Sequence, residues 1–159
     1  MKYNIRDAEA RDMVQVHGLI TELAVFEKED NAVEVTVDDL VRDGFGTKKL
    51  FHCYVAEADG AIVGMALLFP RYSTWKGPII HLEDLVVTER MRGSGLGTAL
   101  LAKVVEHGHK LGVKRINWEV LDWNESAIAL YESKGAQVKR DWNVVHLDEK
   151  GIQTFLERI

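Results

Sequence analysis

The chain has little cysteine and little proline: one cysteine and two prolines stand among its 159 residues. A single cysteine, Cys53, excludes an intrachain disulfide, and without a Cys-x-x-Cys pair it excludes a zinc ribbon. No apolar run approaches the roughly 18 residues of a membrane span, and residues 1–6 lack the apolar stretch of a signal peptide. These absences predict a cytoplasmic protein with no structural metal and no membrane partner.

Basic side chains are also scarce relative to acidic ones. There are 20 lysines and arginines against 25 aspartates and glutamates, which gives a net charge of −5. Nucleic-acid binding usually requires a face rich in Lys and Arg, so we expect no nucleic-acid partner. A modest negative charge suits a cationic partner only weakly, because it also serves solubility.

The length and the absence of linkers predict one domain over residues 1–159. Hydrophobic patterning gives the order β-α-α-β-β-β-α-β-α-β-β, an α/β or α+β protein with a mixed sheet and helices packed on it. Asp59-Gly60, between two apolar runs, predicts a β-hairpin whose second strand ends at Pro70. Thr36 and Asp39 predict a capping box at the start of a short helix. We expect helices at 13–27, 36–41, 95–110 and 126–134, and strands at 3–6, 50–58, 61–69, 79–87 and 115–121, with two more between Gly135 and Leu147.

The most informative segment is a glycine-rich loop, residues 90–98, between a buried strand and an amphipathic helix. Successive backbone N–H groups at such a junction, together with the helix dipole, bind an anion such as phosphate. The alternative is that the glycines only permit a tight turn and close helix packing. A P-loop is excluded because no Gly-Lys-Ser/Thr follows, and a dinucleotide fingerprint fails because Thr98 and Leu100 stand where it needs glycine.

The loop reads Arg92-Gly93-Ser94-Gly95-Leu96-Gly97 and resembles the Arg-x-x-Gly-x-Gly/Ala signature of the GNAT superfamily of N-acetyltransferases. The preceding Leu-Glu-Asp-Leu-Val-Val strand and the later Asn-x-x-Ala-x-x-x-Tyr segment keep the order of that family. Residues 51–57 and 122–125 are similar to its diamine acetyltransferase branch, the spermidine/spermine N1-acetyltransferase-like proteins. The resemblance implies a mixed, largely antiparallel sheet flanked by helices, acetyl-CoA as cosubstrate, and a homodimer.

Acetylation of an amine requires a proton acceptor, because an alkylammonium with a pKa of about 10.4 is almost wholly charged at neutral pH. Glu83, on a mostly apolar strand, is the best candidate. The resemblance implies that Glu83 acts through water and that Asp84 helps to bind the cationic acceptor. Structural salt bridges remain the alternative for both carboxylates.

Tyr131 lies seven residues after Asn124, about two turns along one helix face. The resemblance implies that Tyr131 protonates the leaving thiolate, which suits a phenol, and that Asn124 binds the pantetheine arm. A packed aromatic residue is the alternative reading of Tyr131. The resemblance further implies cofactor contacts from Leu85, Val86, Val87, Arg92, Gly93, Ser94, Gly95, Leu96, Gly97, Thr98, Asn124, Ala127 and Tyr131, with the backbone of the first three pairing with pantetheine amides.

Trp75, Trp142 and Glu27 match positions that line the acceptor groove of the diamine branch, beside Glu83 and Asp84. Ser73 and Arg140 stand where that branch often has acidic residues. Fewer carboxylates therefore remain to bind the distal ammonium groups of a long polyamine. We therefore expect a small cationic acceptor: a diamine, a polyamine or a lysine- or thialysine-like amino acid. Two alternatives are a non-catalytic acyl-CoA sensor and a protein or peptide acetyltransferase.

The remaining nucleophile and histidines suggest little further chemistry. Cys53 and His52 are adjacent on a strand and point to opposite faces, so they cannot form a catalytic dyad, and Cys53 is expected in the core. His107 and His109 are two apart on a helix and do not converge on a metal. His81 shares a strand face with Glu83 and could relay protons to solvent.

Overall fold

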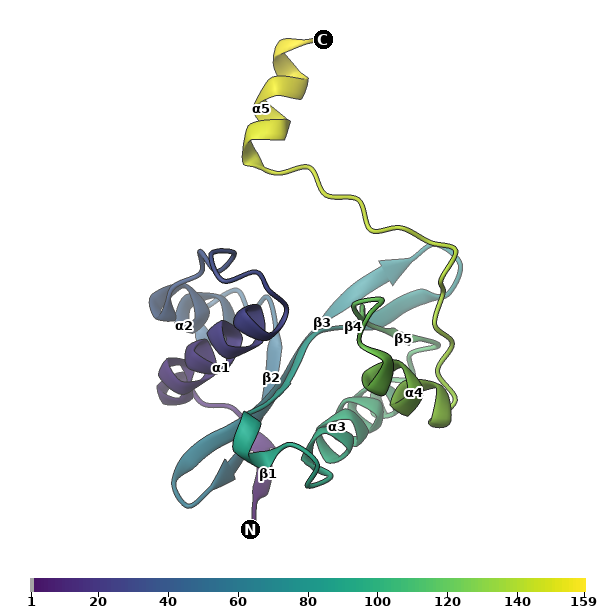
Figure 1. Cartoon of the computed structure of the whole chain (residues 1–159). Coiled ribbons are helices and arrows are strands. Elements are labelled where there is room, and N and C mark those ends of the chain that lie inside the picture. The colour runs from purple at the N-terminus through teal and green to yellow at the C-terminus, as the bar shows by residue number, and fades with distance from the viewer. Residues whose placement is uncertain (1) are drawn as a thin grey trace. The chain divides into compact units, whose positions relative to one another are not determined.

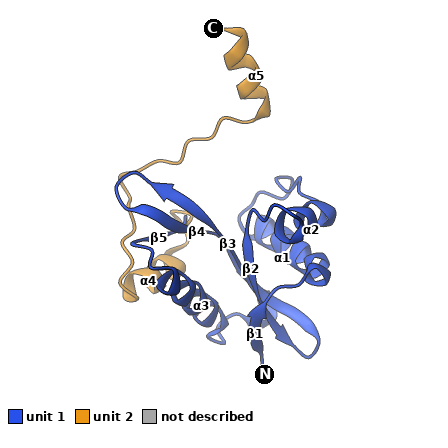
Figure 2. Ribbon diagram, turned by 180° about the vertical axis from the view of Figure 1, so that it is seen from behind, with its two compact units in different colours: residues 1–119 blue, residues 120–159 orange. Residues whose placement is uncertain are grey.

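The computed structural model describes residues 2–159 (Figure 1). Its internal contacts divide the chain into two compact units, residues 1–119 and residues 120–159, which are described separately (Figure 2). Residues 120–159 carry Asn124 and Tyr131, whereas the glycine loop and Glu83 belong to residues 1–119. The single domain stays a prediction.

The first unit is built on a five-stranded sheet in the order β1-β2-β3-β4-β5. The strands are β1 (Asn4–Asp7), β2 (His52–Ala58), β3 (Ala61–Ser73), β4 (Gly77–Val87) and β5 (Ile116–Asn117). The first four pair antiparallel, and β5 pairs parallel with β4. This confirms the mixed, largely antiparallel sheet. The predicted hairpin is also present: Asp59 and Gly60 join β2 to β3 with φ of 51° and 78°, as a two-residue turn with twist matched to the strands requires.

Helices cover both faces of this sheet (Figure 1). The helices α1 (Met13–Phe26) and α2 (Val37–Phe45) bury apolar side chains against Cys53, Val55 and Val86 of the strands. The helix α3 (Leu96–Leu111) packs on the opposite face, where a Cβ on Gly64 of β3 would lie 3.0 Å from Leu100. Glycine at this position therefore allows the close approach of α3 to the sheet, and a larger residue would require Leu100 to shift. No described helix has the length and apolar character needed to cross a membrane.

Side-chain hydrogen bonds stabilise the start of α2 as the sequence indicates. The Thr36 hydroxyl accepts from the Asp39 backbone N–H at 3.1 Å, and the Asp39 carboxylate accepts from the Thr36 N–H at 2.9 Å. Both halves of the capping box are thus present, which confirms the predicted start of α2.

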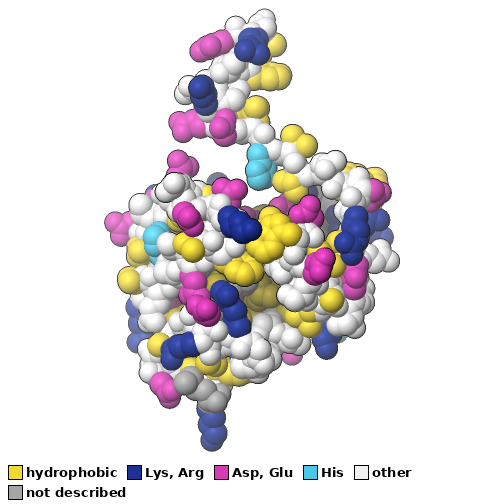
Figure 3. All heavy atoms as spheres, in the orientation of Figure 1, with side chains coloured by type: hydrophobic (Ala, Val, Ile, Leu, Met, Phe, Trp, Pro, Cys, Tyr) yellow, Lys and Arg dark blue, Asp and Glu magenta, His cyan; other side chains and the backbone are white. Residues whose placement is uncertain are grey.

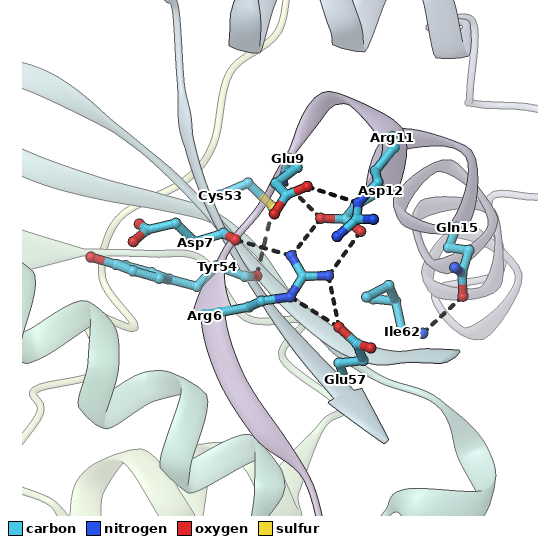
Figure 4. A network of polar contacts seen from close by, with 10 residues as sticks. All are labelled: Arg6, Asp7, Glu9, Arg11, Asp12, Gln15, Cys53, Tyr54, Glu57 and Ile62. Carbon is cyan, nitrogen blue, oxygen red and sulfur yellow. Dashed lines mark hydrogen bonds and ion pairs between the residues drawn. The ribbon is translucent and has the colours of Figure 1, made fainter. Parts of the chain in front are cut away.

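A charged network ties β1 to the segment that enters α1 (Figure 4). The Arg6 guanidinium donates to both carboxylate oxygens of Asp12, at 2.7 and 3.0 Å, and to Glu57 of β2 at 2.8 Å. Asp12 is buried, and its hydrogen bonds with Arg6 hold its pKa below the usual range in spite of burial. This paired arrangement keeps a buried carboxylate satisfied where the chain turns from strand to helix.

Two strand predictions in the first unit need correction. The strand β3 passes through Pro70 to Ser73, because β2 pairs with β3 only as far as Leu68 and leaves Pro70 with a strand neighbour on one side, where a missing N–H is tolerated. The strand expected over 115–121 is limited to Ile116–Asn117. Apolar patterning alone does not reveal where a partner strand ends.

In the second unit, α4 (Glu125–Ser133) and α5 (Glu149–Glu157) are helical. The two strands predicted between Gly135 and Leu147 are absent from the described structure, since this stretch pairs with no strand there. The short tail predicted after Gly151 is instead part of α5, whose N-cap Asp148 accepts from the Gly151 N–H at 2.7 Å. Strand formation needs a free sheet edge as a partner, and sequence patterning does not supply one.

Candidate active site

The glycine loop ends in an open helix N-terminus. Gly93 and Gly95 have φ of 75° and 84°, a left-handed conformation that disfavours other residues. Gly95 is the N-cap of α3 and brings no side-chain oxygen to its first turn, whereas the N-caps of α2, α4 and α5 each accept a backbone N–H. The N–H groups of the first turn of α3 are thus available, with the helix dipole, to an anion.

Arg92 is held beside this loop by three groups. Its Nε donates to the Val87 carbonyl at 3.2 Å, and its guanidinium lies 5.1 Å from the centre of the Phe26 ring and 3.6 Å from the Glu22 carboxylate. Glu22 also accepts from the Thr88 hydroxyl and from the Glu89 backbone N–H. The end of α1 therefore contacts both the segment that enters the loop and the cation beside it.

The strand leading into the loop contains a β-bulge at Glu83. Leu67 of β3 pairs with Asp84 and Leu68 pairs with Leu82, so Glu83 is the extra residue. A bulge redirects a side chain and bends the strand, and such features are frequent beside active sites. The Glu83 side chain is 55% exposed, whereas Asp84 is partly buried.

The strand β4 also has an edge without a strand partner. The strand β5 pairs with β4 only at Ile80 and His81, so within the described residues no strand pairs with the β5-facing edge from Leu82 to Val87. The Val87 carbonyl accepts from Arg92, and the other main-chain groups that point to this edge are open to a ligand with amide groups. The predicted backbone contacts of Leu85, Val86 and Val87 would lie on this stretch.

Carboxylates dominate the electrostatics near Glu83. Burial raises the pKa of Asp84 to about 6, and the charges of Glu83 and Glu27 add to the effect. Burial also raises the pKa of Glu27, at the end of α1, with Glu29 contributing. Asp84 is therefore mostly ionised at neutral pH and loses its charge as the pH falls through about 6. A bound ammonium would relieve this mutual repulsion, so the region favours a cation.

His81 stands directly behind Glu83. Its side chain is 9% exposed, with Nε2 lying 3.3 Å from Glu83 Oε2. Its other ring nitrogen, Nδ1, lies 2.6 Å from the amide nitrogen of Asn117 on β5. The register pairs His81 with Asn117 across the two strands, which accounts for the contact.

The structure does not bring Trp75 close to Glu83. Trp75 lies at the turn between β3 and β4 and is 80% exposed. Glu83 lies six positions after Gly77 on β4, a distance of about 20 Å at roughly 3.3 Å per residue. A short amine held at Glu83 does not reach the turn of this hairpin.

In the second unit, the predicted residues lie on and after α4. The Asn124 side chain is the N-cap and faces the Ala127 N–H at 3.4 Å. Tyr131 is half-buried, and this burial raises its pKa, so the phenol keeps its proton at neutral pH. Arg140 donates to Glu132 at 3.0 Å, and Trp142 is 67% exposed.

Cys53, His52 and His107 make packing or hydrogen-bond contacts within the first unit. Cys53 is buried in the core with α1, and burial raises the pKa of its thiol to about 12, so it is no nucleophile. His52 lies on the opposite face, with its ring 4.6 Å from Tyr54, which confirms that the two cannot form a dyad. His107 Nδ1 lies 2.8 Å from the Tyr54 hydroxyl. Within residues 2–159, no group of three or more His, Cys, Asp or Glu residues could hold a metal ion.

Two residues of this region were given no role in the site by the sequence. Glu22 sits on α1, far along the chain from the segment it contacts, and Asn117 lies on a two-residue strand. Neither residue belongs to a capping or turn motif. Both make their contacts with segments that are distant in the sequence. Only the folded structure identifies them.

Comparisons with known proteins find similarity to acetyltransferases. A model of the "Acetyltransferase (GNAT) family" matches residues 14–136. The thialysine N-epsilon-acetyltransferase of Mus musculus is 40% identical over 141 residues, which cover 84% of this chain and 83% of that protein. The spermidine/spermine N(1)-acetyltransferase-like protein 1 of Homo sapiens is 36% identical over 84% of this chain and 20% of its own length. The structure of aminoglycoside N-acetyltransferase AAC(6')-Iy with CoA has a TM-score of 0.71 at 19% identity, covers 94% of this chain and 95% of that one, and shares the fold.

Proposed function

This chain belongs to the acetyltransferase (GNAT) family, and we propose that it transfers an acetyl group from acetyl-CoA directly to a primary amine of a small cationic acceptor. Family membership makes it an acyltransferase. The observation that carries the proposal is the bulge of β4, which sets Glu83 beside Asp84 on the strand that runs into the open glycine loop. The thialysine N-epsilon-acetyltransferase acts on a small amine by name, so a non-catalytic sensor and a protein acetyltransferase are not favoured.

The residues near the loop fit acetyl-CoA, which supplies the activated acetyl group. Free N–H groups of the first turn of α3 and the cation of Arg92 suit a pyrophosphate. The unpaired edge of β4 suits the amides of a pantetheine arm, and one N–H there can polarise the acetyl carbonyl. Asn124 and Ala127 at the start of α4 are proposed to contact the same arm.

We assign three tasks to the side chains. Glu83, exposed and redirected by the bulge, accepts the proton of the acceptor ammonium through water. Asp84 and Glu27 hold the cationic acceptor through their negative charge. Tyr131, with its raised pKa, keeps a proton for the leaving thiolate.

We expect the Gly97→Leu variant to lose acetyl-CoA binding without losing the fold. A Cβ on Gly97 meets only Val87 Cγ2, at 3.7 Å, so the larger side chain would point toward the end of β4 where the arm is proposed to run. In a thermal-shift titration, acetyl-CoA at about 100 times its Kd should stabilise the parent by about 2.7 kcal/mol. The variant should show no shift.

The matched control is Gly18→Leu, another glycine within a helix with no atom near its Cβ position. This variant should keep the full shift, and adenosine should stabilise neither protein. A parent chain that shows no shift with acetyl-CoA far above micromolar concentration contradicts the proposed cofactor.

The acceptor is expected to be a short amine with one cation at its reacting end. Asp84 and Glu27 supply negative charge near that end. Arg140 and Ser73 stand where the diamine branch often has the acidic residues that would bind the distal ammonium groups of a long polyamine. We therefore expect kcat/KM for thialysine, lysine or putrescine to exceed that for spermine at identical salt. Spermine ahead of the others by tenfold or more would contradict this.

The same assay tests the carboxylates. Because the pKa of Asp84 is about 6, its charge is present above that pH, and KM for a cationic amine should rise as the pH falls through it. In Asp84→Asn, KM above pH 6 should be raised to the level that the parent reaches at low pH, and the rise near pH 6 should disappear.

We also propose a homodimer that involves the C-terminal segment, and a cytoplasmic location consistent with the buried free thiol of Cys53. Residues 142–159 expose many apolar side chains, and those of α5 lie at the surface (Figure 3). A pocket of about 650 Å³ beside α5 is lined by Leu147, Phe155 and Ile159 among others. Contiguous exposed apolar side chains are typical of interaction surfaces, and we propose that a second copy covers these.

A further inference from the structure

The chain enters the glycine loop through a short 3₁₀-helix of three residues, Glu89–Met91, which follows Thr88. The first N–H groups of a helix lack partners within it, and a threonine in front usually caps them with its own oxygen. Thr88 makes no such capping bond, and its hydroxyl donates instead to Glu22 Oε2 at 3.1 Å. The other oxygen, Glu22 Oε1, accepts from the Glu89 N–H at 2.9 Å. A carboxylate from α1 therefore takes the place of the local cap.

The same carboxylate lies beside the cation of the loop. Glu22 Oε1 is 3.6 Å from the Arg92 guanidinium, an ion-pair distance, and Arg92 Nε donates to the Val87 carbonyl at 3.2 Å. The ring of Phe26 has its centre 5.1 Å from the same guanidinium. Glu22 and Phe26 are four residues apart and so share one face of α1. This face contacts both the entry to the loop and its cation.

We propose that Glu22 is a positioning residue, which holds the entry to the glycine loop, and Arg92 beside it, in the conformation that receives the pyrophosphate of acetyl-CoA. This inference rests on the proposed binding of acetyl-CoA at the loop. Gly93 and Gly95 have positive φ, and glycine loses more conformational freedom on ordering than any other residue, so the loop benefits from an anchor. Hydrogen bonds to an ionised carboxylate are stronger than those between neutral groups, which suits Glu22 to that task.

The charge of Glu22 has an effect of opposite sign. A carboxylate near a bound pyrophosphate repels it, so repulsion alone would make acetyl-CoA bind more tightly once Glu22 is replaced. The side chain is 33% exposed, and solvent screens part of this repulsion. Loss of the hydrogen bonds acts differently: when only a fraction of the molecules holds the receptive conformation, the apparent Kd rises by the inverse of that fraction. We expect the second effect to be the larger.

The first test measures the Kd of CoA by calorimetry and needs no turnover. Glu22→Leu removes both acceptor oxygens and should raise Kd about tenfold, which corresponds to a receptive fraction of about one tenth. Glu22→Gln keeps one oxygen for the Glu89 N–H without the charge, and its Kd should stay within about threefold of the parent. Equal loss in the two variants would mean that only the charge matters and would overturn the inference, as would unchanged or tighter binding by Glu22→Leu.

The matched control is Thr21→Val, on the neighbouring residue of α1. The Thr21 hydroxyl donates to the His17 carbonyl of the same helix at 3.0 Å. The substitution therefore removes a side-chain hydrogen bond of α1 that does not involve the loop. CoA should bind to this variant as it does to the parent.

The second test separates the loop from the rest of the active site. S-acetylpantetheine carries the thioester and the pantetheine arm but no pyrophosphate. Glu22→Leu should lower kcat/KM for acetyl-CoA about tenfold through KM, and should change kcat/KM for S-acetylpantetheine less than about twofold. Equal losses with the two donors would indicate a general disturbance of the fold and would overturn the inference.

The third test uses the free chain and does not depend on the cofactor. In hydrogen exchange followed by NMR, the Glu89 amide should exchange about tenfold faster in Glu22→Leu than in the parent, because its acceptor is gone. The amide of Val55, buried in β2, should exchange at the same rate in both. Unchanged exchange at Glu89 would overturn the inference whether or not the chain binds CoA. A parent chain that does not bind CoA contradicts the proposed cofactor itself, and the exchange rates then still decide whether Glu22 holds the entry to the loop.

Discussion

Replacing Tyr131 by phenylalanine should lower kcat about 10²–10⁴-fold, with little change in the affinity for acetyl-CoA. The substitution removes only the phenol oxygen, so the packing of the half-buried ring on α4 is retained. Burial raises the pKa of Tyr131, which keeps the proton on the oxygen until a stronger base, the departing thiolate, develops. Steady-state kinetics with acetyl-CoA and a saturating amine measure the effect.

The control for this substitution is Tyr72→Phe, which removes the hydroxyl of an exposed tyrosine on β3. It should leave kcat unchanged, because its ring stands in solvent on the long hairpin. A Tyr131→Phe variant that turns over like the parent would mean that Tyr131 is a packing residue or that another group donates the proton.

Replacing Glu83 by glutamine should produce a loss of similar size, about 10²–10⁴-fold near neutral pH, because the amide cannot accept the proton of the ammonium. The loss should shrink as the pH approaches the amine's own pKa of about 10.4, where the acceptor deprotonates without help. The parent should gain much less over the same range. The measurement is kcat/KM against pH with one amine and constant ionic strength.

Glu106→Gln is the matched control, since Glu106 is an exposed carboxylate on α3 that pairs with Lys103 at 3.8 Å. It should reproduce the profile of the parent. If Glu83→Gln retains full activity near neutral pH, the acceptor proton is taken by another group, and Asp84, which stays mostly ionised there, becomes the next candidate.

Local signals in the sequence were sufficient for several elements. Asp59-Gly60 determines a two-residue turn because both positions need positive φ, and Thr36 with Asp39 determines a helix start because their side chains bond nearby N–H groups. The glycine loop is equally local, since its conformation and its open N–H groups arise within a few residues.

The strands after Gly135 failed as predictions for the opposite reason. Apolar side chains at 142, 144, 145 and 147 resemble a strand, but a strand exists only where another backbone edge accepts its hydrogen bonds. Pro70 illustrates the same dependence: whether proline ends a strand depends on which neighbour is present, and β2 has already ended there.

By itself, the sequence determined the family resemblance, the glycine loop and the two side chains, Glu83 and Tyr131, proposed for proton transfer, because these are properties of residue type and short spacing. Tertiary structure alone decided that Glu83 occupies a bulge, that Asp84 is partly buried near other carboxylates, and that Asn117 lies beside His81. Each of these depends on the register between strands distant in the chain. A pKa and a side-chain direction are set by neighbours in space, and no local pattern specifies those neighbours.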